Sequence, residues 1–245
     1  MNRYAEKCLL LIRLIIAHLI TDFLFKSDSW VNQKDNNGFF SKHLYVHGIV
    51  AGILAYCFSG LWNLLWIPII VGSTHVLIDG IKVKCEDNIQ TFLTDQLFHF
   101  MILLVIWLQI INPKSGDIEV LGQIFPPGIK IWIIIASYLL IIWPTGVLIS
   151  KMTEKLRRDI FQKEISDREW KEESLEKTGK WIGWLERFLI LTFFLLKQYE
   201  VIGLLVAVKT FRFSGPQKLN EYILIGTLLS FSIAILVGLI VSLFL

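Results

Sequence analysis

The sequence predicts an all-α, polytopic integral membrane protein with about eight transmembrane helices. Hydrophobic residues make up 54% of the 245 residues, and the mean hydropathy of +0.59 is well above that of an ordinary soluble domain. Several apolar stretches also approach the roughly 20 residues that a helix needs to cross a bilayer. Length, composition and segment size therefore all favour a chain that crosses the membrane repeatedly.

Eight apolar segments are predicted to be transmembrane helices. In chain order they cover about 8–25, 42–58, 61–81, 90–111, 129–150, 181–196, 198–213 and 222–245. The sixth and seventh are short, and we expect them to form a tight hairpin supported by neighbouring helices.

The segments divide the chain into four predicted parts. These are a membrane bundle over 1–111, a loop and fifth transmembrane helix over 112–150, a charged helical arm over 151–180, and a three-helix membrane segment over 181–245. The arm mixes charges of both signs closely, as solvated helices do. It is the predicted contact surface for a cytoplasmic protein partner.

Lysine and arginine residues are concentrated in alternate loops. They are frequent after the first, third, fifth and seventh predicted helices and sparse in the other loops. By the positive-inside rule the lysine- and arginine-rich loops are cytoplasmic, which puts both ends of the chain outside, although Arg3 and Lys7 oppose this orientation mildly. The net charge of +3 is too small to indicate nucleic-acid binding.

All five histidines lie between residues 18 and 99, and each is four positions from another histidine or an aspartate. The pairs are His18/Asp22, His43/His47, His75/Asp79 and Asp95/His99. Residues at i and i+4 share a helix face. The pairs fall at the end of one predicted helix or the start of the next, so up-down connectivity brings them to one side of the membrane. The first four helices are therefore predicted to form a bundle lined by His and Asp, of the kind that holds metal ions.

All eight of these side chains are candidate metal ligands. Imidazole and carboxylate without thiolate suit zinc, manganese or iron, and we expect a divalent ion, zinc before the others. The three cysteines are scattered and support neither a disulfide framework nor a thiolate zinc site. Eight ligands suffice for two ions with open positions, or for one ion whose histidines are oriented by carboxylates. The rival interpretation is a polar network that joins the helices without metal.

Further polar residues at the same level are candidates for substrate contact. They are Lys82, Gln96, Lys209 and Arg212. A cation such as Lys82 could hold an anionic oxygen of a substrate. Alternatively, Lys82 and Lys209 extend to the membrane interface and Arg212 pairs with Glu221. The catalytic candidates are Asp22, Asp79, Asp95 and Lys82, with one carboxylate as general base.

The strings HLITDFLFKSDSW, KHLYVH, THVLIDGIK and FLTDQLFHF resemble a bacterial membrane family catalogued as domain of unknown function 3307. The strings GKWIGWLERFLIL, AVKTFRF and EYILIGTLLSF are similar to the carboxy-terminal extension of its longer members. The resemblance implies an integral protein of the bacterial inner membrane and no established activity. One departure is Lys26, where glutamine would be expected. More loosely, the His-x-x-x-Asp pattern resembles the YdjM-like proteins, described as membrane-bound metal-dependent hydrolases, an analogy that alone cannot establish function.

We expect a membrane-embedded, metal-dependent hydrolase whose site faces the cytoplasm. A water activated by the metal would attack a phosphoester, or another bond such as an acyl bond, of a lipid or amphiphile from the cytoplasmic leaflet. One alternative is a transporter or channel for a metal ion or proton, which would need polar residues through to the opposite face. The other is a non-catalytic membrane module with a structural metal.

Overall fold

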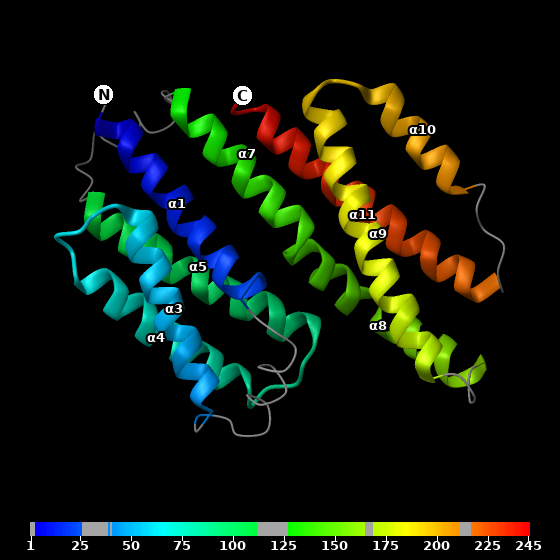
Figure 1. Cartoon of the computed structure of the whole chain (residues 1–245), viewed down its shortest axis with the longest axis horizontal. Helices are drawn as coiled ribbons and strands as arrows, with labels where there is room; N and C mark the ends of the chain where they lie inside the picture. The colour runs from blue at the N-terminus through cyan, green and yellow to red at the C-terminus, as the bar shows by residue number, and fades with distance from the viewer. Residues whose placement is uncertain (1–2, 26–38, 40, 112–126, 165–168, 211–216) are drawn as a thin grey trace. The chain divides into compact units, whose positions relative to one another are not determined.

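The computed structural model describes residues 3–25, 39, 41–111, 127–164, 169–210 and 217–245 (Figure 1). The regular elements within these ranges are all helical, so the predicted all-α class is confirmed. They are α1 (Arg3–Phe23), α3 (Lys42–Ser59), α4 (Trp66–Lys82), α5 (Ile89–Ile111), α7 (Pro127–Ile142), α8 (Pro144–Glu164), α9 (Glu169–Leu195), α10 (Tyr199–Thr210) and α11 (Gln217–Ser242). The chain forms two compact units, Met1–Leu139 and Leu140–Leu245.

Three helical stretches among the described residues are long and apolar enough to cross a membrane. They are Ile89–Ile111, Gly128–Arg158 and Asn220–Ser242. Length and apolar composition are the properties that a bilayer requires of a spanning helix. The structure therefore agrees with the composition in indicating a membrane protein.

Three predicted helices begin or continue differently in the structure. The sixth, predicted from residue 181, is the end of α9, which begins at Glu169 within the predicted arm. The third begins at Trp66 rather than at residue 61, because α3 ends at Gly60 with a φ of 67° and the chain turns before α4 starts. Glycine adopts this left-handed conformation at little cost. The segment predicted as one helix over 129–150 is interrupted between α7 and α8, where Pro144 lacks the backbone N–H that a continuous helix needs.

In the first unit, α1, α3, α4 and α5 form a four-helix arrangement. Helix α3 packs against α1 and α4, and α5 packs against the same two helices from the other side (Figure 1). Their shared apolar core consists of Leu10, Leu14, Ala51, Ala55, Ile67, Val71, Leu103 and Ile106. The core residues lie in the first half of α4, the second halves of α3 and α5, and the first two thirds of α1. Because these segments share one half of the up-down bundle, the other half is left for polar side chains.

Glycines let α3 and α4 approach closely. A Cβ atom at Gly52 would lie 2.5 Å from the backbone oxygen of Pro68, and one at Gly48 would lie 2.3 Å from Val76 Cγ2. Such small-residue contacts are typical of helix pairs in membranes, where close backbone approach provides the packing energy. His47, which precedes Gly48, also lies against α4, with its ring centroid 4.9 Å from that of His75.

In the second unit, α9 packs against α8, α10 and α11. Its core includes Ile190, Phe194, Ile202, Phe231 and Ala234. Two backbone carbonyl groups at the break between α7 and α8 accept hydrogen bonds from side chains. Thr145 Oγ1 donates to Leu140 O at 3.0 Å, and the buried Arg187 donates through Nη2 to Ile142 O at 3.0 Å. The Thr145 bond replaces the helical bond that Pro144 cannot donate to Leu140 O, and the Arg187 bond satisfies the carbonyl at the end of α7.

Candidate metal centre

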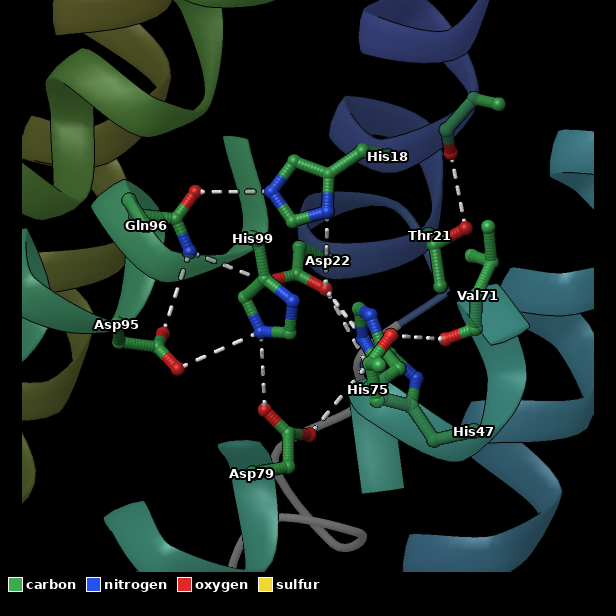
Figure 2. Close-up of polar contacts among 12 residues, drawn as sticks. His18, Thr21, Asp22, His47, Val71, His75, Asp79, Asp95, Gln96 and His99 are labelled. Carbon is green, nitrogen blue, oxygen red and sulfur yellow. Dashed lines mark hydrogen bonds and ion pairs between the residues drawn. The ribbon is translucent and has the colours of Figure 1, made fainter. Parts of the chain in front are cut away.

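Seven of the eight predicted ligands converge in the first unit, and each is at most 6% exposed. They are His18 and Asp22 near the end of α1, His47 in α3, His75 and Asp79 near the end of α4, and Asp95 and His99 in α5 (Figure 2). We call these seven side chains the His/Asp cluster. The i, i+4 spacing places both members of a pair on one helix face, and packing of the four helices turns those faces towards one another.

Asp22 is the carboxylate that most imidazoles approach. Its Oδ1 atom lies 2.9 Å from His75 Nε2, 3.4 Å from His47 Nε2 and 3.9 Å from His18 Nδ1. Two ligands bound at zinc distances are about 3.3 Å apart in a tetrahedral shell, and cis ligands in an octahedral shell are about 2.9 Å apart. The two shorter contacts, from Asp22 Oδ1 to His75 and to His47, therefore match the spacing of ligands around one ion.

A second set of contacts is centred on His99. Its Nε2 atom lies 3.5 Å from Asp95 Oδ1 and 3.7 Å from Asp79 Oδ1. The other oxygen of Asp79, Oδ2, lies 3.8 Å from His47 Nε2. Asp79 thus has one carboxylate oxygen towards each set of ligands.

Several inward atoms of the His/Asp cluster are buried and have no hydrogen-bond partner among the described residues. They include Asp22 Oδ1, His47 Nε2, His75 Nε2, Asp95 Oδ1 and His99 Nε2. Even the 2.9 Å contact between Asp22 and His75 is not in hydrogen-bond geometry. Leaving such an atom buried and unsatisfied costs about 1–3 kcal/mol. A cation shared among them would satisfy several at once.

Within the described residues, three groups of side chains could each hold a metal ion. They are His18/His75/His99, Asp22/His47/His75 and Asp22/Asp95/His99, with the ligand atoms of each group within 4.8 Å of one another. All members are buried. The ligand chemistry and the distances thus fit a metal ion, as the residue pairs predicted.

Gln96 and Lys82 contact the His/Asp cluster from outside. Gln96 Nε2 donates to Asp22 Oδ2 at 3.1 Å and to Asp95 Oδ2 at 3.2 Å, while its Oε1 lies 3.2 Å from His18 Nε2. An amide oxygen only accepts, so His18 Nε2 carries the proton and its Nδ1 is free to bind a metal. Lys82 Nζ lies 2.5 Å from Asp95 Oδ2. These contacts orient ligands, as the outer partners in metal sites do.

A small cavity of about 10 Å³ lies beside His18, His75 and His99. The rest of its lining is mainly apolar and comes from all four helices. This volume is about enough for one water molecule. Thr21, which is fully buried and donates to Ala17 O at 2.8 Å, also lines the cavity.

Some predicted site residues lie elsewhere. His43 is half-buried one turn before His47 and is not a member of the three groups found among the described residues. Lys209 belongs to the second unit, where its Nζ lies 2.7 Å from Glu186 Oε2. Arg212 and Lys26 lie outside the described residues.

Two features of the site were not predicted, although the sequence contains a signal for each. Thr21 follows His18 by three positions, which places its hydroxyl on the ligand-bearing face of α1. Gly48 and Gly52 form a G-x-x-x-G motif in an apolar segment, a pattern typical of close helix packing.

The comparisons with known proteins concern this same part of the chain. Residues 10–123 match the DUF3307 family, described as a protein of unknown function. The predicted resemblance is thereby confirmed for the region that holds the His/Asp cluster. The DUF3307 match brings no activity with it. No curated protein and no solved structure matches the chain.

Proposed function

We propose that the protein binds a divalent metal ion in the His/Asp cluster and uses it to hydrolyse a bond in a lipid or amphiphile. The bond would be a phosphoester, or another bond such as an acyl bond, and the substrate would arrive from the cytoplasmic leaflet. The observation that carries the proposal is the convergence of buried imidazole nitrogens and carboxylate oxygens that lack hydrogen-bond partners among the described residues. Zinc is the first candidate, and manganese and iron are the others.

The charge of the site supports a divalent ion. With neutral histidines, three carboxylates and the Lys82 ammonium leave a formal charge of −2. A buried charge of this size is costly in an apolar, membrane-embedded bundle unless it is compensated. One divalent cation would balance it.

The cavity beside His18, His75 and His99 supports a role in hydrolysis. A bound metal supplies Lewis acidity and lowers the pKa of a coordinated water towards neutrality. The cavity has room for about one water. The proposed general base is a carboxylate among Asp22, Asp79 and Asp95, and Asp22 and Asp95 belong to candidate ligand groups that include the cavity-lining His75 and His99. Lys82 is 22% exposed at its side chain, and we propose that it contacts an anionic group of the substrate.

The membrane placement is part of the proposal. Three stretches have the length and composition of spans, and we propose that the remaining apolar helices complete a multi-pass protein of about eight spans in the bacterial inner membrane. In this arrangement, the distribution of lysine and arginine supports a position of the His/Asp cluster near the cytoplasmic face. The charged segment over 151–180 would then lie in the cytoplasm, available to a protein partner.

A structural metal in a non-catalytic module is the second candidate function. The cavity of about 10 Å³ admits a water but is much smaller than a lipid head group. Transport is less well supported, because the apolar core of Leu10, Leu14, Val71, Leu103 and Ile106 fills the bundle beyond the cluster. An ion pathway needs polar residues along its length.

Elemental analysis of detergent-purified protein tests the proposal. Wild type should contain near-stoichiometric zinc, manganese or iron, and the variants His75→Ala and His47→Ala should contain much less. The metal-loaded protein should then hydrolyse a member of a panel of phosphoesters and lipids, and His75→Ala should not. Metal without hydrolysis would favour the structural module. Wild type that binds no metal after reloading would refute both functions and leave a polar network that joins the helices without metal.

A further inference from the structure

We propose that the His/Asp cluster holds two divalent ions, with Asp22 and Asp79 shared between them. This inference rests on the proposed metal-binding function and extends it to the stoichiometry and the charge of the substrate.

Two of the three candidate ligand groups have one member in common, and the third, His18/His75/His99, takes one histidine from each of them. One group is Asp22/His47/His75 and another is Asp22/Asp95/His99, so five residues form two groups that share only Asp22. A single ion cannot take all of these ligands and keep a place for water in a tetrahedral shell. Two ions joined by a carboxylate would use all five.

Asp79 has the geometry of a second shared carboxylate. Its Oδ2 atom lies 3.8 Å from His47 Nε2, and its Oδ1 atom lies 3.7 Å from His99 Nε2. The two oxygens thus face different ligand sets. Ions in two-metal sites are about 3.5–4 Å apart, a separation that a bridging carboxylate spans with one oxygen on each ion.

Gln96 contacts carboxylates from both ligand sets. Its Nε2 donates to Asp22 Oδ2 and to Asp95 Oδ2, so one amide group orients a carboxylate from each set. The same side chain faces His18 Nε2 through Oε1, which leaves His18 Nδ1 for the ion near Asp22. The three hydrogen-bond contacts of Gln96 thus favour one arrangement of ligands from both sets.

The charge of the site predicts unequal affinities. One divalent ion balances the formal charge of −2, and a second would leave an excess of +2. We therefore expect the second ion to bind about tenfold more weakly or worse, because it enters beside a like charge. An anion at the site would offset the excess, so inorganic phosphate should strengthen binding of the second ion. The preferred substrate would then be an anionic phosphoester.

Titration of the metal-free, detergent-purified full chain with Mn²⁺ tests this inference. We expect two Mn²⁺ per wild-type chain, and an electron paramagnetic resonance signal at saturation that shows spin coupling between neighbouring ions. Phosphate should lower the second dissociation constant and leave the first nearly unchanged. Asp95→Asn should bind one Mn²⁺ with the signal of an isolated ion. Asp87→Asn, the same change at an exposed position before α5 begins, should bind two.

The outcomes separate the two proposals. One Mn²⁺ per wild-type chain at saturation, with an uncoupled signal, would overturn the two-ion inference and leave the metal-binding function intact. No bound Mn²⁺, zinc or iron in wild type would refute the metal-binding function itself. Should Asp95→Asn fail to fold, the wild-type stoichiometry and spin coupling decide the question alone.

Discussion

Replacement of Gln96 by leucine is expected to weaken metal binding about 10- to 100-fold, the usual effect of losing a side chain that orients metal ligands. In the structure, Gln96 Nε2 donates to Asp22 Oδ2 at 3.1 Å and to Asp95 Oδ2 at 3.2 Å, and its Oε1 lies 3.2 Å from His18 Nε2. Leucine has a similar size but cannot make these contacts. Asp95 Oδ2 would keep Lys82 as its partner, whereas Asp22 Oδ2 would lose the only donor that the described structure gives it.

The expected loss follows from those contacts. Each hydrogen bond is worth about 0.5–1.5 kcal/mol net. The loss of about 1.4–2.8 kcal/mol that corresponds to a 10- to 100-fold change is therefore within the range of three bonds. The ligands themselves remain, so the number of ions bound at saturation should not change.

Competition with a chromophoric chelator in detergent measures the dissociation constant directly. Gln90→Leu is the matched control, because Gln90 is exposed in the first turn of the same helix, and it should bind metal like wild type. An affinity of Gln96→Leu within about twofold of the control would contradict the orienting role. A folded Gln96→Leu protein that binds no metal at saturation would show instead that Gln96 is itself a ligand.

Three further predictions follow from the same geometry. His43→Ala should retain the metal that His47→Ala loses, because His47 lies beside Asp22 and Asp79 and belongs to a candidate ligand group, whereas His43 belongs to none of the three groups found among the described residues; elemental analysis of the pair checks this, and equal losses would make His43 a ligand. Gly52→Ala should lower the melting temperature in detergent, since its Cβ would lie 2.5 Å from Pro68 O, and overpacking costs about 1–3 kcal/mol. Gly203→Ala, with no atom within 4 Å of the added Cβ, is its control, and equal melting temperatures for both would refute the close packing of α3 and α4. Removal of bound metal with a chelator should also lower the melting temperature. The free energy of unfolding should fall by about 2.7 kcal/mol relative to protein in metal at 100 times the dissociation constant. An unchanged thermal transition would contradict metal binding to the folded state.

Local patterns are reliable guides to the helices of this chain and poor guides to where they end or break. Hydropathy is a property of composition, so the amino-acid sequence is sufficient to predict long apolar helices such as Ile89–Ile111 and Asn220–Ser242. Helix ends depend on single residues. Gly60 ends α3 because it adopts a left-handed backbone, and Pro144 interrupts the predicted span over 129–150 because it lacks an N–H group.

The candidate site shows the same division between local and tertiary information. The all-α class and the i, i+4 pairing of histidines with aspartates follow from the sequence, because helix periodicity alone places such residues on one face. Which pairs meet depends on the tertiary packing. It brings His47 to Asp22 and Asp79 but does not place His43 in the candidate groups, although the two histidines are one turn apart in the same helix. Helix packing, with the glycine contacts between α3 and α4, sets the rotation of each face, and that rotation cannot be read from spacing along the chain.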